Sequence, residues 1–263
     1  MQLLPVQFIL RLQQNFCKIL QSKYPTTKVY SYEIFGDSNR RTAWQETYGT
    51  DALPSIDWSK ADTILSLESD FLGKEGNVVE NMREFSGRRD VMRGTDFNRL
   101  YCAEGTMSLT GMNADYRLRV RPDKQLEFVL SLLNEIVNNR FASEIQLSSS
   151  AASLISKYDL KKFVNENSLN EKYVQFLVDD LIHSKGKGIV YGGETLSIDT
   201  HKAINLLNEV LGNNTLYKTG SYTVPQIKHS SVDEIKQLIS KMNNGNVGAV
   251  IHFDTKSDLS VAF

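Results

Sequence analysis

The sequence predicts an α/β protein with three layers, in which helices cover both faces of a mostly parallel sheet. The first observation is residues 63–67, a continuous apolar run of the kind found in strands that are buried on both faces. The second is the order strand, helix, strand between residues 61 and 103, which is typical of parallel strands joined by a helical crossover. The third is the return of the same alternation after residue 187. Few hairpin signals accompany these segments, so we expect right-handed βαβ crossovers.

The first 50 residues predict a helix, a strand and a second helix. Four apolar residues recur at steps of four within residues 6–23 and indicate an amphipathic helix: Phe8, Leu12, Phe16 and Leu20. Aromatic and β-branched residues dominate residues 28–35, which favours a strand. Turn residues at 36–38 lead into a helix over residues 39–48, and Gly49 ends that helix.

The remaining elements follow from the same periodicities. Further strands are expected over residues 63–67, 98–103, 116–121, 187–191 and 247–253. Further helices are expected over residues 76–87, 197–211 and 232–242, and a long helix is expected to begin at Pro122.

The segment between the two α/β stretches has a different character. Residues 141–186 contain no convincing strand, and polar runs near 148–150 and 165–170 interrupt what we expect to be short helices. The predicted organisation is a first α/β lobe over residues 1–140, a helical insert over 141–186 and a second α/β lobe over 187–263.

Composition excludes several classes of function. The chain has 30 basic and 31 acidic residues, so no basic field attracts nucleic acid. No apolar run approaches the roughly 20 residues that span a bilayer, and the first residues do not form a signal peptide. Cys17 and Cys102 lie in apolar contexts and are expected to be buried thiols. The chain has no Cys-x-x-Cys motif, so we expect it to hold no zinc and no iron–sulfur cluster by itself.

Two carboxylates are candidates for chemistry at the edge of the predicted sheet. Glu68 and Asp70 follow the strand that ends near Leu67, and open parallel sheets place their ligands at this edge. Such a pair can act as general acid and base, but no histidine, lysine or nucleophile is tied to it by sequence. Helix capping by Asp70 is the alternative.

Two other motifs could contact anions. Gly192-Gly193 follows a predicted strand and precedes a helix, where backbone amides either cradle a phosphate or simply form a tight turn. Arg117, Arg119 and Arg121 alternate with apolar residues, so strand periodicity puts three guanidinium groups on one face. That face either meets an anionic ligand or partner, or is solvated and pairs with local carboxylates.

The histidines give no catalytic or metal pattern. Four are scattered without ligand spacing: His183, His201, His229 and His252. His252 lies in the last predicted strand and is expected to be a core residue. No Ser/His/Asp or Cys/His arrangement is apparent, and the sequence therefore predicts no catalytic, cofactor-binding or metal-binding residues.

The central stretch resembles a known family. Residues 61–65 (ADTIL) and the turn after them resemble the Ala-Asp-x-Ile-Leu segment of the molybdopterin oxidoreductases, and residues 109–122 resemble the family's Thr-x-Thr-Ala-x-x-Ala-Asp…Arg-Pro segment. Residues 58–71 and 107–121 are most similar to one branch, the large iron–sulfur subunit of the quinol:cytochrome c oxidoreductase called alternative complex III. The resemblance implies Rossmann-like lobes and, in the family, molybdopterin guanine dinucleotide and iron–sulfur clusters.

Three turns that contact the cofactor in the family are altered here. The Gly-x-Asn-Pro turn is replaced by residues 68–71 (ESDF), the Asp-Pro-Arg turn by 104–106 (EGT), and the Pro-Gly-Thr-Asp turn by 122–125 (PDKQ). Carboxylates now stand where a phosphate-rich cofactor needs neutral donors. The resemblance therefore implies a structural or docking domain without a cofactor and without catalysis of its own. Its partners would be other subunits of a membrane-bound electron-transfer complex on the periplasmic face of a bacterial membrane. The alternatives are a fragment of an active molybdenum oxidoreductase and a module that binds a nucleotide-like small molecule at Gly192-Gly193.

Overall fold

The computed structural model describes residues 6–30, 36–92, 94, 96–140, 147–223, 230 and 232–251. Internal contacts divide the chain into two compact units. The larger unit comprises residues 35–226, and the smaller unit combines the two terminal segments, 1–34 and 227–263.

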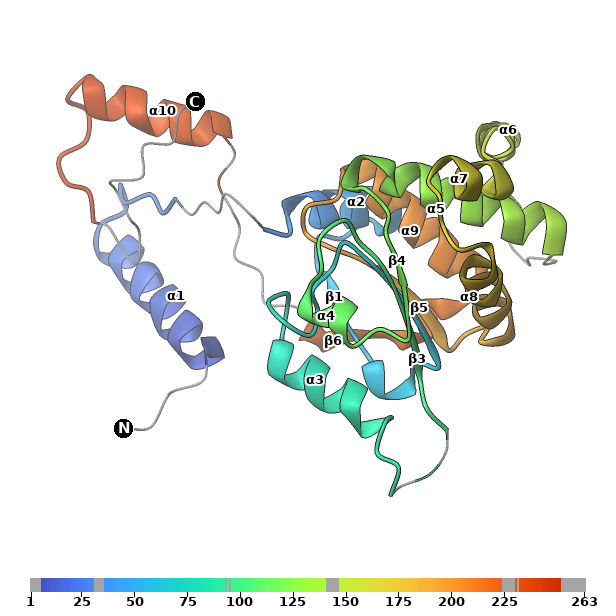
Figure 1. The fold of residues 1–263 in the computed structure, drawn as a ribbon. Coiled ribbons are helices and arrows are strands. Elements are labelled where there is room, and N and C mark those ends of the chain that lie inside the picture. The colour runs from blue at the N-terminus through green and yellow to red at the C-terminus, as the bar shows by residue number, and fades with distance from the viewer. Residues whose placement is uncertain are drawn as a thin grey trace. The chain divides into compact units, whose positions relative to one another are not determined.

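The larger unit is built on a parallel four-stranded sheet (Figure 1). Its strands are β2 (Thr63–Leu67), β3 (Arg99–Ala103), β4 (Tyr116–Leu118) and β5 (Gly188–Gly192), in the spatial order β4-β3-β2-β5. All five residues of β2 are buried, as expected for a central strand with both faces covered. The chain moves outward from β2 through β3 to β4 and then returns to the other side of β2, so the switch point of this doubly wound sheet lies between β2 and β5.

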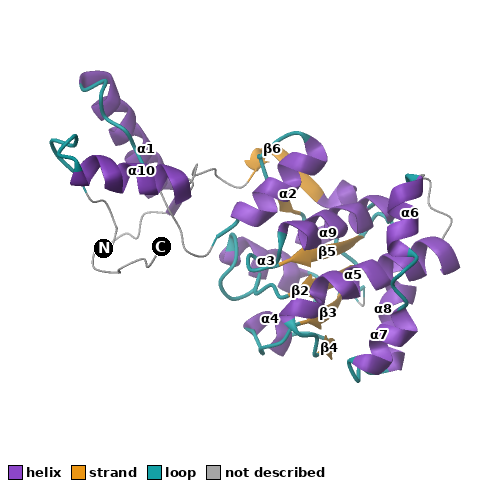
Figure 2. Cartoon of the chain, turned by 90° about the horizontal axis from the view of Figure 1, so that it is seen from above, coloured by secondary structure: helices purple, strands orange, loops and turns teal. Residues whose placement is uncertain are grey.

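Helices cover both faces of this sheet and complete the three layers. Figure 2 shows α3 (Val78–Gly87) and α4 (Leu109–Met112) on one side, with α5 (Gln125–Asn134), α7 (Leu160–Glu166) and α8 (Glu171–His183) on the other. Successive β2 residues enter different cores, because Ile64 packs with Trp58, Phe71 and Phe85, whereas Leu65 packs with the core of α5. The α/β class and the parallel sheet are therefore confirmed.

The remaining helices also match the periodicity of the sequence. They are α1 (Val6–Lys23), α2 (Ser38–Tyr48), α6 (Ser149–Ile155), α9 (Ile198–Val210) and α10 (Val232–Asn243). The long helix expected after Pro122 consists of a 3-10 turn (Pro122–Lys124), α5 and a π-helical segment (Glu135–Arg140). Within the expected insert, the described residues 147–186 form only α6, α7 and α8, joined by turns. No helix in the described part of the chain is long and apolar enough to cross a bilayer.

The strands expected over residues 28–35 and 247–253 are a correction. Residues 28–30 and 247–251 form no strand, and the rest of both segments lies outside the described residues. Both segments belong to the smaller unit, whose described residues provide no strand for them to pair with. Strand propensity alone does not make a strand without such a partner.

A second, two-stranded sheet was not predicted. It pairs β1 (Pro54–Ile56) with β6 (Tyr217–Thr223) in antiparallel fashion. The predicted lobes 1–140 and 187–263 share both sheets, because β5 also pairs with β2 along its whole length.

Candidate functional site

The carboxyl ends of the parallel strands form the candidate site. Strands β2, β3 and β5 end at Leu67, Ala103 and Gly192, which are in register at one edge of the sheet. In open α/β sheets this edge is where ligands bind. Glu68 and Asp70 lie there as predicted, together with Glu104, whose role the sequence did not reveal.

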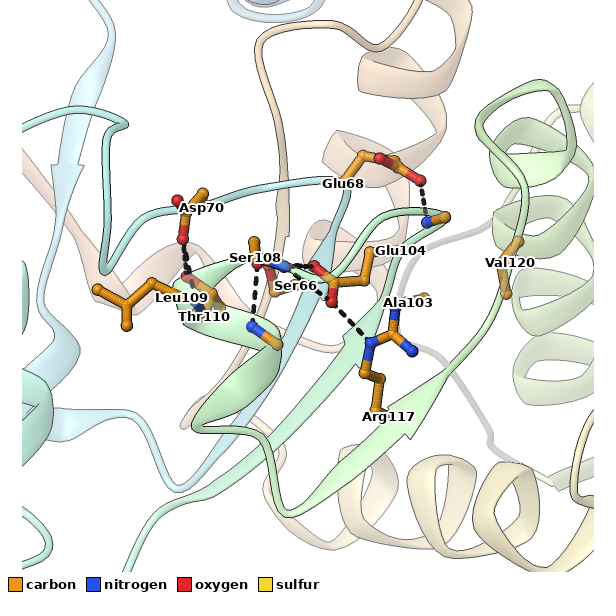
Figure 3. A network of polar contacts seen from close by, with 12 residues as sticks. Ser66, Glu68, Asp70, Ala103, Glu104, Ser108, Leu109, Thr110, Arg117 and Val120 are labelled. Atoms are coloured by element: carbon orange, nitrogen blue, oxygen red, sulfur yellow. Dashed lines mark hydrogen bonds and ion pairs between the residues drawn. The ribbon is translucent and has the colours of Figure 1, made fainter.

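Glu104 is the centre of a buried polar network (Figure 3). Its side chain is 2% exposed and accepts hydrogen bonds from the Ser108 hydroxyl at 2.6 Å and from Arg117 Nε at 2.7 Å. The Ser108 backbone N–H donates to the same carboxylate, at 3.2 and 3.3 Å from its two oxygens. Ser108 also caps α4, because its hydroxyl accepts from the Gly111 N–H at 3.0 Å. Burial alone would raise the pKa of Glu104, but the bonds from Arg117 and Ser108 outweigh it and the pKa is lowered.

Asp70 caps the same short helix from outside it. Its Oδ1 accepts from the backbone N–H of Thr110 at 2.9 Å and from the Thr110 hydroxyl at 3.1 Å. The Thr110 hydroxyl oxygen also accepts from the Leu72 N–H at 3.1 Å, so it ties the turn after β2 to α4. The geometry of Asp70 is that of a helix cap, which was the alternative to acid–base chemistry.

Glu68 makes the equivalent contact with the turn after β3. Its Oε1 accepts from the Gly105 N–H at 2.6 Å and from the Gln125 side-chain amide at 3.4 Å. Burial raises the pKa of Glu68, and the neighbouring charge of Glu104 acts in the same direction. The backbone of Glu68 has a φ of +48°, a left-handed conformation that is uncommon outside glycine.

Glu75 completes a set of carboxylates that engage backbone amides. It accepts from the Ser69 hydroxyl at 3.0 Å and from the Asp70 N–H at 3.1 Å. Each of the four acids at this edge thus accepts from a different backbone N–H: Glu68 from Gly105, Asp70 from Thr110, Glu75 from Asp70, and Glu104 from Ser108. The amide donors that a bound phosphate would use in this fold are taken by the chain itself.

The Gly192-Gly193 turn is a point of close packing. The Gly193 N–H donates to the carbonyl oxygen of Leu67 at 2.8 Å. A Cβ at Gly193 would lie 1.9 Å from the carbonyl oxygen of Glu68, and one at Gly192 would lie 2.6 Å from the Ile204 side chain. Glycine is therefore required by the contact between the ends of β2 and β5, which supports the tight turn over the phosphate cradle.

Arg40 of α2 fills the switch point beside this turn. Its guanidinium donates to the Gly192 carbonyl oxygen at 2.6 Å and to the Tyr191 hydroxyl at 2.7 Å, and it lies over the Tyr191 ring. It also pairs with Asp37 at 3.1 Å and with Glu75 at 3.4 Å. The sequence gave no signal for this residue, because α2 precedes β5 by about 140 residues and local patterns do not report such contacts. Arg40 is already neutralised and offers no free positive charge.

The histidines do not contribute to a catalytic group. His201 is 3% exposed, its Nε2 has no hydrogen-bond partner among the described residues, and burial together with the charge of Arg40 lowers its pKa to about 3. His183 is exposed, with Nδ1 2.6 Å from the carbonyl oxygen of Asp179. His229 and His252 lie outside the described residues.

The cysteines give no metal site either. Both are free thiols, as predicted, with Cys17 partly buried and Cys102 fully buried. Burial raises the pKa of the Cys102 thiol, which makes it a poor ligand and nucleophile. The described ranges contain no group of three or more His, Cys, Asp or Glu side chains that could hold a metal ion.

The three arginines do not act as one group. Strand β4 ends at Leu118, so the strand periodicity that would align them stops after Arg117. Arg117 is bound to Glu104, and Arg121 pairs with Asp123 at 2.9 Å. Both pairs lie within the chain, as the local-carboxylate alternative supposes.

Arg119 differs from the other two. It is exposed, and it lies between Leu118 and Val120, which are both buried in the core of α5. Its side chain forms no ion pair or hydrogen bond with any described residue.

Comparison with known proteins supports the fold. No protein-family model matches the sequence, and no curated protein matches it. Among solved structures, the chain is similar to acetylene hydratase from Pelobacter acetylenicus, with a TM-score of 0.53 and 12% sequence identity over 73% of this chain. The match covers 26% of the acetylene hydratase chain. The α/β fold is similar to that of a molybdopterin oxidoreductase, as the resemblance of the central stretch implied.

The residues at the strand ends do not fit the cofactor of that family. A pyrophosphate needs free amide donors and positive charge, whereas this edge has four carboxylates on its amides and arginines that are already paired. A unit charge about 4 Å from a carboxylate of the same sign is disfavoured by about 4 kcal/mol near a protein surface.

Proposed function

We propose that this chain is a structural and docking domain without a cofactor, within the large iron–sulfur subunit of an electron-transfer complex of the alternative complex III type. The fold and the segments 58–71 and 107–121 support the parentage. The observation that carries the proposal is the use of Glu68, Asp70 and Glu104 as internal partners for the amides at the ligand edge.

On this proposal the domain performs no catalysis and shapes the subunit around it. Its fold provides a rigid core, and the electron carriers belong to neighbouring domains or subunits. Its partners are other subunits of the membrane-bound complex, on the periplasmic face. The quinol and cytochrome c chemistry of such a complex then takes place outside this domain.

The test is a cofactor analysis of protein from its native source. Molybdenum and tungsten are measured by elemental analysis, and pterin by its fluorescence after oxidation. A molybdenum enzyme purified from the same cells serves as the positive control, because it shows that the cells load cofactor. We expect no stoichiometric metal or pterin, and one metal per chain would overturn the proposal.

A titration tests the alternative of a nucleotide-binding module. Calorimetry with GDP, and separately with inorganic pyrophosphate, is carried out on the purified chain. We expect no saturable heat up to millimolar ligand, because no amide at Gly192-Gly193 is free. A dissociation constant of about 10 μM or tighter, roughly −7 kcal/mol, would show that the edge has kept a ligand site.

A further inference from the structure

Helix α4 carries large apolar side chains on its outer surface. Met107 is 61% exposed, Leu109 40% and Met112 70%, although the three lie within six residues. Figure 3 shows the Leu109 side chain turned away from Glu104 and Arg117. Single exposed apolar residues are ordinary, but several together on one short element are typical of a contact surface.

The inner side of the same element is held rigidly. Thr110 is fully buried, and its N–H and hydroxyl donate to Asp70. A Cβ at Gly111 would lie within 2.0 Å of Glu104 Oε1, at 1.9 Å, so the helix rests directly on that carboxylate. A surface fixed in this way loses little conformational freedom when it binds, which favours association.

Positive charge without an internal partner borders the apolar residues. Lys74 belongs to the turn of Asp70, because its N–H donates to the Asp70 carbonyl oxygen at 2.9 Å. Arg119 follows Arg117, which is bound to Glu104 beneath α4. Both cations are exposed, and their side chains form no ion pair with any described residue. An acidic rim on a partner would complement them.

We propose that Met107, Leu109 and Met112, bordered by Lys74 and Arg119, form a docking surface for an acidic protein surface with an apolar centre. The surface is called the α4 surface below. This inference rests on the proposed function, since it names the face through which the docking domain meets another subunit. It replaces a docking role for all three arginines, because Arg117 and Arg121 are paired within the chain.

Site-specific photo-crosslinking in the native source tests the α4 surface. A photoreactive residue replaces Met107 or Met112 in the complete protein, and crosslinked peptides are identified by mass spectrometry. Leu154, which is 49% exposed on α6, is the matched control position. We expect both α4 positions, and not Leu154, to crosslink to one and the same protein, at an acidic segment of it. Equal crosslinking at Leu154, or different proteins at the two α4 positions, would overturn the proposal.

Charge and apolar variants test the chemistry of the contact. Met112→Glu should lower recovery of the crosslinked partner about tenfold, as expected for an interface anchor. Arg119→Glu should lower it as well and make it less sensitive to salt, whereas the control Lys157→Glu should not. Melting temperatures should be unchanged, because all three residues are exposed. Unchanged recovery in Met112→Glu would refute the apolar centre.

Two further outcomes would assign the surface to another occupant. Sedimentation of the purified chain that shows a dimer weakened by Met112→Glu would make the occupant a second copy. Binding to anionic vesicles that Met112→Glu abolishes would make it a lipid surface. Either result overturns the α4 surface while leaving the metal and pterin analysis intact, and stoichiometric metal would overturn the proposed function while leaving the crosslinks intact.

Discussion

The pair between Arg117 and Glu104 gives a quantitative test of the polar network. The bond from Arg117 Nε is 2.7 Å long, with the Glu104 side chain 2% exposed and the Arg117 side chain 25% exposed. Breaking a fully buried pair by removing one partner costs about 3–5 kcal/mol. Water reaches Arg117 and reduces this value, so we expect Glu104→Gln to lower the free energy of unfolding by about 2–4 kcal/mol.

A double-mutant cycle separates the pair from the other bonds of Glu104. Unfolding by urea is measured for Glu104→Gln, for Arg117→Gln and for the double variant. We expect a coupling energy of about 1.5–3 kcal/mol, because the double variant no longer leaves a buried charge unpaired. The matched control is the exposed pair of Arg121 and Asp123, which has a similar bond of 2.9 Å with side chains 75% and 56% exposed. That pair should show a coupling of about 0–1 kcal/mol.

The pH dependence of the same variant provides an independent check. The pKa of Glu104 is lowered in the folded chain, so its carboxylate stabilises the fold above the ordinary value of 4.5, and this stability is lost as the pH falls through the lowered pKa. The difference between the wild-type chain and Glu104→Gln should therefore shrink in acid. A coupling energy for Glu104 and Arg117 no larger than that of the exposed pair would refute the reasoning.

Two other variants test the packing around the switch point. The pKa of His201 is about 3 instead of 6.5, so the unfolded chain binds more protons between these values and stability falls with the pH; from pH 7.5 to pH 5 the loss is about 2 kcal/mol, and urea unfolding of His201→Asn should lack it. A wild-type slope in the variant would contradict the burial of a neutral imidazole. Gly193→Ala should destabilise the chain by about 1–3 kcal/mol or more, because its Cβ meets backbone atoms of Glu68. Gly87→Ala, at the end of α3 with no atom within 4 Å of its Cβ, is the control and should be neutral or stabilising; equal thermal shifts would argue against the close contact.

The sequence was sufficient for the main sheet and insufficient for the small one. The apolar run of β2 and the helical spacing around it predicted a buried parallel strand, which is what residues 63–67 form. Strand β1 has only three residues, and β6 (YKTGSYT) lacks an apolar run. Their pairing depends on a contact between segments about 160 residues apart, which no local pattern encodes.

The same limit applies to the candidate site. Chain order placed Glu68 and Asp70 at the ligand edge, because residues that follow a parallel strand share that edge. Their partners Gly105 and Thr110 belong to the turn and helix after the next strand, so whether the carboxylates face a ligand or the chain itself was not predictable. Arg117 was assigned to a face by strand periodicity, but its partner Glu104 was determined by tertiary packing.

The carboxylates at the strand ends also bear on how such a domain is made. Each one gives a backbone amide the negative partner that a phosphate gives it in a nucleotide-binding protein. The loops at this edge therefore complete their hydrogen bonding within the chain, and their order does not depend on a ligand. On the proposed function, the domain matures by folding alone. It has no apo form that must be kept open for cofactor insertion, and its assembly into a larger complex can begin as soon as the polypeptide is complete.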